Sequence, residues 1–395
     1  MSDGIPGIRR RISQTSHQSP LTSHRIQGEK MKRRSFLKKA VAGMATGAVA
    51  APAIAQSQPS IQWRLASSFP KSLDTIFGAA DIIAKRVAES TENRFQIRVF
   101  AAGELVPGLQ VLDAVQNGTV ECGHTAPYYY IGKDPAFAFA TALPFGLNAR
   151  QQNAWMYYGG GIEAVTDLFK DYGCVQFLAG NTGAQMGGWF RKEIKTVADL
   201  KGLKFRIGGL GGMVLAKLGV VGQQIAGGDI YPALERGTID AAEWVGPYDD
   251  EKLGLNKVAK FYYYPGWWEG GPQLSAIVNQ KKWAELPKHY QSAFEAACAE
   301  ANVHMLARYD AKNPDALRRL LAAGAQLRAF PRPVMEASLK AANELYGELA
   351  QKSTHFKRIY DGWNKFRAEQ FLWFRVAEGS YDSFVSATHA APAKK

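Results

Sequence analysis

Beyond its N-terminal segment, the chain alternates between strand-like and helix-like patterns of apolar and polar positions. Residues 61–69 (IQWRLASSF) and 95–100 (FQIRVF) have the two-residue period of half-buried strands. Residues 73–90 carry apolar side chains at helical spacing, and the run GLQVLDAVQNG is expected to be a helix that Gly118 closes. This β-α-β-α order predicts an α/β layered domain.

Two later segments repeat one pattern at a constant offset of 119 positions. LDAVQNGTVECGHTAP (112–127) and YPALERGTIDAAEWVGP (231–247) each predict a helix, a glycine cap, a short strand and a loop. The offset is too long for a solenoid and favours two similar lobes, with chance similarity of short units as the alternative. In each lobe the residues after the strand, His124-Thr125 and Glu243-Trp244, would lie at the sheet edge where open α/β folds bind ligands.

Two long amphipathic stretches follow, beginning near His289 and Val334. The first predicts a long connecting helix, and the second predicts a further C-terminal helix from about Asn364 to Phe384. This last helix carries an aromatic stripe that consists of Phe366, Phe371, Trp373, Phe374 and Tyr381. Such a stripe needs a surface to cover, which is either the back of its own monomer or a second chain.

The first 55 residues have the composition of an export signal. Arg33 and Arg34 precede SFLKK, an alanine-rich apolar run and the small-residue ending Ala53-Ile54-Ala55. This order predicts a twin-arginine signal that is cleaved after Ala55, with Met31 as a possible true start, and therefore a periplasmic protein. The apolar run is too weak for a stable membrane span.

Removing this leader changes the charge of the chain. Ten of the 48 Lys and Arg residues and two of the 35 Asp and Glu residues lie in the leader, so the net charge falls from +13 to +5. A mild excess without a basic run argues against a nucleic-acid partner. The three cysteines, Cys122, Cys174 and Cys298, are far apart and predict buried free thiols rather than disulfides or metal ligands.

Candidate chemistry concentrates in NTGAQMGGWFRKEIKTVADLKGLKFRIGG, residues 181–209. The alternation of KFRI leaves two interpretations of Arg206, a solvated charge on an edge strand or a fixed receptor for an anion. Arg191 is interpreted as a structural or surface charge. His124 lies close to Cys122, but no acid or nucleophile accompanies the pair at a spacing that would indicate catalysis.

A resemblance covers essentially the whole mature chain. Gln185 followed by WFRK and ADLKGLKFR, with GTIDAAEW and KKWAELP further on, resembles the solute-binding proteins of tripartite ATP-independent periplasmic (TRAP) transporters. Glu243-Trp244 before GPYDD is most similar to the subgroup that binds 2-oxo acids or short hydroxy acids together with a metal ion. The resemblance implies an α/β, two-lobed, periplasmic-binding-protein-like fold with a hinge. It also implies a homodimer without enzymatic activity that delivers a small monocarboxylate to a membrane permease.

The resemblance also implies roles for single residues. Arg206 would form a two-point pair with the solute carboxylate, a geometry that a guanidinium provides and an ammonium does not, and the flanking glycines would let the ligand approach the backbone closely. Gln185, Tyr129 and Trp244 would complete the solute site. The cation would be Na⁺, or alternatively Ca²⁺, held by Glu243, the backbone carbonyl of Trp244 and Gln185. Glu269 would contact the solute and add a second carboxylate to the cation, which favours Ca²⁺. The alternative is that Glu243 only pairs with Arg206.

Lobe limits and rival functions follow from this interpretation. One lobe is expected to hold residues 60–179 and 270–309, the other 180–269 and 310–360, and residues 361–395 would form the dimerisation helix and tail. The first rival is an exported metal-dependent enzyme that acts on a keto acid. Against it, the sequence places no candidate base, nucleophile or cofactor fingerprint beside these groups. The second rival is a dimerising scaffold or sensor module.

Overall fold

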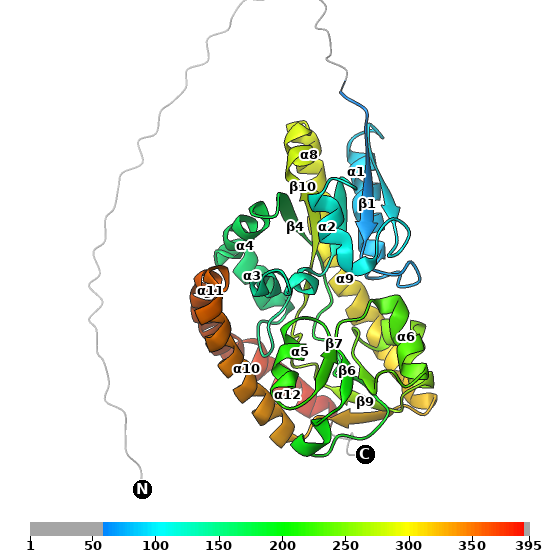
Figure 1. Ribbon diagram of the computed structural model, residues 1–395, viewed down its shortest axis with the longest axis vertical. Helices are drawn as coiled ribbons and strands as arrows, with labels where there is room; N and C mark the ends of the chain where they lie inside the picture. The colour runs from blue at the N-terminus through cyan, green and yellow to red at the C-terminus, as the bar shows by residue number, and fades with distance from the viewer. Residues whose placement is uncertain (1–57, 391–395) are drawn as a thin grey trace, which may run out of the picture. The chain divides into compact units, whose positions relative to one another are not determined.

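Two β-sheets organise the part of the chain that the computed structural model describes, residues 58–390 (Figure 1). The expected α/β class is therefore confirmed. The expected twin-arginine signal and its cleavage site lie outside the described residues. No helix within residues 58–390 combines the length and the apolar character that a membrane span requires.

The first sheet has five strands in the order β2-β1-β3-β10-β4. Its strands are β1 (Ile61–Ser67), β2 (Phe95–Phe100), β3 (Cys122–Thr125), β4 (Cys174–Asn181) and β10 (Gln273–Asn279). β1 pairs in parallel with β2 and β3, whereas β10 runs antiparallel to β3 and β4. In β2 the alternation predicted from the sequence is real, because Phe95 and Ile97 are buried while Gln96 and Arg98 are exposed.

The second sheet has six strands in the order β11-β9-β5-β8-β6-β7. Its strands are β5 (Gly188–Phe190), β6 (Lys204–Arg206), β7 (Val221–Gln223), β8 (Ala241–Ala242), β9 (Phe261–Tyr264) and β11 (Gln326–Ala329). β6 pairs in parallel with β7 and β8, and β5 runs antiparallel to β8 and β9. We call each sheet with the elements packed on it a lobe, the first and the second.

The two lobes share one topology, which confirms the internal repeat seen in the sequence. The order β2-β1-β3-β10-β4 of the first sheet matches β7-β6-β8-β5-β9 of the second, with a single antiparallel strand at the same place. The acidic residues of the two repeats, Glu121 and Asp240, make equivalent hydrogen bonds. Glu121 accepts a hydrogen bond from the backbone N–H of Arg64 in β1 (2.8 Å), and Asp240 accepts one from Lys204 in β6 (3.0 Å). Each carboxylate therefore joins its own strand to the parallel neighbour.

Twelve α-helices surround the sheets in the described part of the chain. They are α1 (Gly78–Ser90), α2 (Val111–Gln116), α3 (Ala149–Tyr158), α4 (Gly161–Lys170), α5 (Gly209–Ala216), α6 (Gly227–Glu235), α7 (Pro247–Lys252), α8 (Gln280–Glu285), α9 (Lys288–Ala322), α10 (Arg332–Lys352), α11 (Thr354–Val376) and α12 (Glu378–Ala390). α9 is the expected long connecting helix: it packs on β4 and α1 of the first lobe and on α7 of the second (Figure 1). It therefore ties the lobes together along one edge.

The C-terminal region differs from the single helix expected over 364–384. The chain leaves the helical conformation at Ala377 (φ −83°, ψ −92°), just before Gly379, so α11 and α12 are separate helices. Gly379 lies in the first turn of α12, and its low helix propensity weakens the helical conformation next to this break. Phe366 was expected in the exposed stripe, but it packs against the hydrophobic core. Phe371, Trp373 and Tyr381 are exposed as expected, whereas Phe374 is half-buried.

The three cysteines are free and buried, as the sequence predicted. Burial raises the pKa of the Cys122 thiol well above its usual value, and it does the same for Cys298. Both thiols therefore stay protonated and behave as small apolar side chains.

Candidate functional site

Arg206 and Glu243 meet because the parallel strands β6 and β8 end side by side. Arg206 is the last residue of β6 and lies opposite Ala242 of β8, and the backbone N–H of Glu243 donates to the Arg206 carbonyl (3.2 Å). The two side chains are 1% and 0% exposed. Arg206 is therefore not a solvated edge charge, and the neighbouring carboxyl ends of two strands form the base of the site.

Three polar contacts fix the Arg206 guanidinium. Its Nε donates to the carbonyl of Ile225 (3.0 Å), and its Nη1 donates to the Glu243 carbonyl (2.9 Å) and also pairs with Glu243 Oε1. The face of the guanidinium lies over the Trp244 ring, 5.0 Å from its centre. Nη2 is buried and has no well-aligned partner among the described residues. One edge of the fork is thus held by the protein, while the other has the Tyr129 hydroxyl close to it and keeps N–H groups to donate.

Glu243 divides its two oxygens in a similar way. Oε1 accepts from Arg206 and from the backbone N–H of Gly208 (2.8 Å), which precedes α5. Oε2 is buried without a well-aligned partner in residues 58–390. Burial raises the pKa of Glu243, against the opposing effects of Arg206 and of the Gly208 N–H. The pairing alternative considered for this residue therefore accounts for one oxygen and leaves the other without a function.

Backbone hydrogen bonds hold three loops of the second lobe against one another. The N–H of Gln185 donates to the Glu269 carbonyl (3.1 Å), and the N–H of Gly266 donates to the Gln185 carbonyl (2.9 Å). The N–H of Met186 donates to the carbonyl of Val245 (3.0 Å), which directly follows Glu243 and Trp244. The loops that carry Gln185, Glu243 and Glu269 are separate in sequence, and these bonds bring them together.

Buried oxygens without well-aligned hydrogen-bond donors accumulate at this point, and the Tyr128 hydroxyl lies close to the Glu269 carboxylate. Both carboxylate oxygens of Glu269 and Oε1 of Gln185 lack well-aligned partners within the described residues, as Glu243 Oε2 does. Burial, and after it the charge of Glu243, raises the pKa of Glu269 well above its usual range. A buried polar group without a partner costs about 1–3 kcal/mol, so four such acceptors in one place indicate a site for a ligand that supplies positive charge.

The three consecutive tyrosines have different surroundings, as three adjacent side chains must. Tyr130 is part of the first-lobe core, where its hydroxyl bonds Thr125 (2.9 Å) and the backbone N–H of Leu112 (3.1 Å). The rings of Tyr128 and Tyr129 stack with centres 5.0 Å apart and face the second lobe. The backbone carbonyl of Tyr129 accepts from Gln224 of the second lobe (2.9 Å). Burial raises the pKa of the Tyr129 hydroxyl to about 12, so it remains a donor.

The glycines that follow Arg206 make room for a tyrosine. A Cβ on Gly208 would lie 2.9 Å from the Tyr128 ring, and one on Gly209, where φ is +59°, would lie 2.2 Å from it. These glycines therefore let Tyr128 of the first lobe approach α5 closely, and their expected role in letting a ligand approach the backbone stays a prediction.

A small cavity of about 10 Å³ lies between the lobes at this site. Tyr128, Tyr129, Gln185 and Trp244 line it, together with apolar side chains of the first lobe. A larger groove of about 410 Å³ lies elsewhere, between α4, α8, α9 and β4, and includes none of the six candidate residues. We place the site at the small cavity because Gln185 and Trp244 line it, and the buried pair of Arg206 and Glu243 lies next to Trp244.

The structure thus brings all six candidate residues to one place between the lobes: Tyr129, Gln185, Arg206, Glu243, Trp244 and Glu269. Their acceptors consist of two carboxylates and one amide oxygen, which is the donor chemistry that hard cations such as Na⁺ and Ca²⁺ prefer. No group of three or more His, Cys, Asp or Glu side chains suited to a metal occurs within residues 58–390. The assignment of single residues to solute or cation remains a prediction.

Comparison with known proteins shows which family the chain belongs to. Residues 66–353 match the model of the family described as bacterial extracellular solute-binding protein, family 7. The chain belongs to this family. A monocarboxylate 2-oxoacid-binding periplasmic protein of Nostoc sp. is 56% identical to this solute-binding protein over 91% of the chain and 100% of the relative. The expected family and periplasmic location are thereby confirmed.

Two crystal structures of TRAP transporter solute-binding proteins share the fold. One, from Bordetella bronchiseptica, is 58% identical, covers 84% of this chain and 99% of its own, and has a TM-score of 0.83. It is a mixed-occupancy dimer with copurified calcium and picolinate in an active site. The other, from Pseudoalteromonas atlantica, is 40% identical and has a TM-score of 0.80. It covers 82% of this chain and 99% of its own, and it contains sodium and pyruvate.

Membership in a solute-binding family decides between the classes of function considered. It makes the protein a carrier that binds a solute for transport, and it sets aside the keto-acid enzyme and the scaffold or sensor module. The surroundings of His124 agree, since its ring lies in the first-lobe core with Nε2 on the Ala179 carbonyl (3.2 Å). Arg191 is exposed, as the interpretation of a surface charge required.

His124 leads to a prediction about stability. Burial lowers the pKa of its imidazole from 6.5 to about 4, so the unfolded chain binds the proton more readily. Its contribution to stability is complete above pH 6.5 and is lost as the pH falls toward 4. In His124→Gln this dependence disappears, so the difference in unfolding free energy between wild type and variant should shrink by about 2.5 kcal/mol between pH 7 and pH 4.5.

Urea unfolding of both proteins at the two pH values measures this difference. The buried carboxyls of Asp249 and Asp250, whose pKa values are raised to about 6 and about 7, titrate in the same range but occur in both proteins, so their effect cancels. A difference that stays constant between pH 7 and pH 4.5 would show that His124 is not held neutral by the fold.

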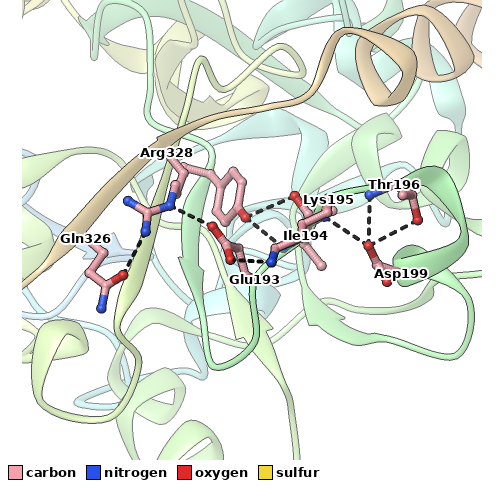
Figure 2. A network of polar contacts seen from close by, with 8 residues as sticks. Glu193, Ile194, Lys195, Thr196, Asp199, Gln326 and Arg328 are labelled. Carbon is pink, nitrogen blue, oxygen red and sulfur yellow. Dashed lines mark hydrogen bonds and ion pairs between the residues drawn. The ribbon is translucent and has the colours of Figure 1, made fainter.

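The segment that leads into β6 is fixed independently of any ligand. Figure 2 shows Glu193 paired with Arg328 of β11 (2.8 Å) and Asp199 accepting backbone N–H groups at the turn that follows. The hydroxyl of Tyr263 accepts from the Ile194 N–H (2.7 Å) and donates to its carbonyl (3.1 Å). Arg206 therefore extends from a strand whose approach is anchored to β9 and β11.

Several residues of the site were not found from the sequence. Tyr128 contacts the glycines after β6, the Gly208 N–H binds Glu243, and the Ile225 carbonyl binds Arg206 Nε. The last two contacts use backbone groups, which any residue type supplies. The sequence therefore contained no signal for them.

Proposed function

We propose that this solute-binding protein captures a short 2-oxo acid together with a cation and delivers it to the membrane permease of a TRAP transporter. A 2-hydroxy acid of the same size is the related alternative. One observation carries the proposal: four buried acceptor oxygens, on Gln185, Glu243 and Glu269, lie beside a buried arginine with a free N–H edge. The acceptors suit a cation, and the arginine suits a carboxylate.

The residues then divide the work between solute and cation. Arg206 holds the solute carboxylate with the N–H groups of its free edge, and its contacts with Ile225 and Glu243 keep that edge oriented. Glu243, Glu269, Gln185 and the Trp244 carbonyl hold Na⁺ or Ca²⁺. The cation supplies the positive charge that lets two buried carboxylates and an anionic solute share one dry site. Tyr129 covers the solute from the first lobe.

The ligands of the related proteins support this class of solute. Pyruvate and picolinate share one feature, a carboxylate next to a second donor atom, which is a keto oxygen in one and a ring nitrogen in the other. Such a pair of donors can chelate a hard cation in a five-membered ring while the carboxylate still faces an arginine. A 2-oxo or 2-hydroxy acid meets this requirement, whereas a simple fatty acid does not.

Binding is proposed to close the two lobes over the solute. We retain the limits 60–179 with 270–309 and 180–269 with 310–360 for the moving lobes. Support comes from the strands that cross between them: the chain leaves the first sheet with β4 at Asn181 and returns with β10 at Gln273. Export by the twin-arginine signal around Arg33 and Arg34 is also retained as a proposal.

Native mass spectrometry tests the proposal directly. The full protein is incubated with pooled 2-oxo, 2-hydroxy and simple monocarboxylic acids in the presence of Na⁺ or Ca²⁺. We expect one 2-oxo or 2-hydroxy acid and one cation per chain, with the added acids unchanged in amount and identity. Retention of an unsubstituted fatty acid, or of no acid at all, would contradict the proposed solute class.

We also propose that α11 and α12 form a homodimer interface. Apolar side chains along both helices are 43–71% exposed, namely Phe371, Leu372, Trp373, Val376, Tyr381 and Phe384. An apolar surface of this kind on a protein outside the cytoplasm favours a protein partner. The dimeric state of the Bordetella bronchiseptica relative supports a second copy as that partner.

Two substitutions at this surface should separate the protomers. Trp373→Glu with Phe384→Glu places charges in the proposed apolar contact, so we expect the wild type to sediment as a dimer and the double variant as a monomer that still binds solute. Tyr158→Glu is the matched control, because Tyr158 is 94% exposed and belongs to α3 rather than to either helix of the proposed interface. Sedimentation equilibrium at micromolar concentration decides; a monomeric wild type or a dimeric double variant would refute the interface.

A further inference from the structure

We infer that Asp250 is a positioning residue of the cation site, which acts through the peptide group between Trp244 and Val245. Its carboxylate holds the N–H of this group, and it thereby directs the Trp244 carbonyl at the cation and increases the negative charge on the carbonyl oxygen. The inference rests on the proposed function, in which this carbonyl is a ligand of the cation. It adds a carboxylate that acts on the cation only through another residue.

The peptide group between Trp244 and Val245 is held differently from its two neighbours in the loop. In the group before it, the Glu243 carbonyl accepts a hydrogen bond from the buried guanidinium (2.9 Å). In the group after it, the Val245 carbonyl accepts from the Met186 N–H (3.0 Å). In the middle group the held atom is the N–H of Val245, which donates to Oδ1 of Asp250 (3.3 Å). The protein therefore binds the carbonyls of the outer groups and the N–H of the middle group.

A hydrogen bond on one side of a peptide group affects the other side. The group between Trp244 and Val245 is trans and planar, so its N–H and its C=O point in opposite directions. An acceptor that is fixed behind the N–H consequently fixes the direction of the carbonyl. A carboxylate also makes a charge-assisted hydrogen bond and polarises the group, which makes the carbonyl oxygen a stronger ligand for a hard cation such as Na⁺ or Ca²⁺.

The second sheet fixes Asp250 from behind. The residue is 0% exposed, and its Oδ2 accepts from the indole N–H of Trp189 in β5 (3.0 Å) and from the hydroxyl of Tyr262 in β9 (2.7 Å). Trp189 and Tyr262 are paired in the sheet, and their rings stack with centres 4.0 Å apart. The carboxylate is thus clamped by two rigid donors through one oxygen, and the other oxygen is left to orient the loop.

Asp250→Asn tests the inference, because it keeps the size of the side chain but removes its charge and one of its two acceptor oxygens. Pyruvate is titrated calorimetrically into wild type and variant at a series of concentrations of Na⁺ or Ca²⁺, whichever cation tightens binding to the wild type. The titrations are made at pH 8.5, since burial raises the pKa of the Asp250 carboxyl to about 7 and the group must be ionised.

We expect the two quantities from these titrations to respond differently. The cation concentration that gives half of the tightening should rise at least about tenfold in Asp250→Asn, which is the size of effect that loss of a hydrogen-bond partner behind a metal ligand produces. The dissociation constant of pyruvate at saturating cation should stay within about threefold of the wild-type value, because Arg206 and the other ligands of the cation are unchanged.

Tyr262→Phe is the matched control. It removes a hydrogen bond from Oδ2 of Asp250 but leaves the bond between Oδ1 and Val245 in place. If Asp250 only satisfied the buried donors of the sheet, both variants would change the cation requirement alike. The inference predicts that Tyr262→Phe keeps the wild-type cation requirement within about twofold, although its thermal unfolding temperature falls with the lost hydrogen bond.

Each result supports or overturns the inference. An unchanged cation requirement in Asp250→Asn, an equal rise in Tyr262→Phe, or a loss of pyruvate affinity that saturating cation does not restore would overturn it and leave the proposed function intact. A wild type whose pyruvate binding neither cation tightens would overturn the proposed role of the cation, and the inference with it.

A second pair of variants applies if Asp250→Asn does not fold. The amide NH₂ of the asparagine would face the indole N–H of Trp189, and Trp189→Phe removes this competing donor. Trp189→Phe combined with Asp250→Asn is therefore compared with Trp189→Phe alone. The combined variant must show the same rise in the cation requirement for the inference to stand.

Discussion

Replacing Arg206 by lysine is expected to weaken 2-oxo acid binding by about 2 to 4 kcal/mol, a loss of roughly 30- to 1,000-fold in affinity. Lysine keeps the positive charge, but it lacks the fork that contacts Ile225, Glu243 and the solute at once. Its ammonium would bind Glu243 and have no second edge for a carboxylate. Titration calorimetry with pyruvate measures the loss.

The control for this substitution is Arg191→Lys, which makes the same chemical change at an exposed arginine beside β5. We expect Arg191→Lys to bind pyruvate like the wild type. Thermal unfolding of each variant distinguishes a lost contact from a lost fold. If Arg206→Lys melts like the wild type and binds pyruvate within about threefold of it, the two-point pair with the carboxylate does not exist.

Glu243→Gln should abolish both solute binding and its dependence on added cation. Glu243 Oε2 is buried beside Glu269 and Gln185 and is proposed to hold the cation that bridges to the solute. Cation and solute affinities are linked reciprocally: the factor by which the cation tightens solute binding equals the factor by which the solute tightens cation binding. A variant that cannot hold the cation therefore loses that factor in solute affinity. We expect at least about a hundredfold loss, the size of effect that removal of one member of a buried charged pair produces.

The competing interpretation predicts the opposite sign for this variant. If Glu243 only neutralises Arg206, removing its charge frees the arginine, and an anionic solute binds as tightly as before or more tightly. Calorimetric titrations of wild type and Glu243→Gln, each with and without Na⁺ or Ca²⁺, separate the two interpretations. Glu235→Gln, an exposed glutamate on α6, controls for the change in net charge. Unchanged or tighter binding in Glu243→Gln would eliminate the bridging cation.

The sequence was informative where a pattern has a local cause. The alternation in FQIRVF, the helix and glycine before β3 and the repeat of that unit before β8 all reflect periodicity or a backbone position that glycine tolerates. The glycines at the two repeats, Gly118 and Gly237, have φ values of +72° and +70°, which is why the pattern could be recognised twice. The repeat was the basis for predicting two similar lobes, and the two sheets share one topology.

The sequence was less informative about contacts between the lobes. Phe69, Ile76 and Leu274 are ordinary apolar residues in their own segments, and only the folded arrangement gathers them with Trp244 around one cavity. The break between α11 and α12 at Ala377 was missed because the apolar pattern continues across it. Phe366 was misassigned for a similar reason, since helical spacing shows a stripe but not which of its members another helix covers.

For the charged groups, the sequence predicted which residues take part in the site but not which of their atoms are available. Arg206 was selected from the KFRI strand pattern and the family resemblance, and Glu243 from its position after a short strand; the structure places both at the ends of parallel neighbours. That Glu243 would bind the Gly208 N–H with one oxygen and leave the other without a partner depends on the turn into α5. A sequence gives residue types, whereas the availability of a particular oxygen is a property of the fold.

The central claim is that this protein binds a 2-oxo acid through a cation and does not convert it. The most direct test is a calorimetric titration of pyruvate into the purified mature protein, first in a chelator-treated, sodium-free buffer and then after addition of Na⁺ or Ca²⁺. The account predicts saturable binding of one pyruvate per chain that is at least about tenfold tighter with the cation, and full recovery of unchanged pyruvate afterwards. Equal affinity with and without cation, or consumption of the pyruvate, would contradict it.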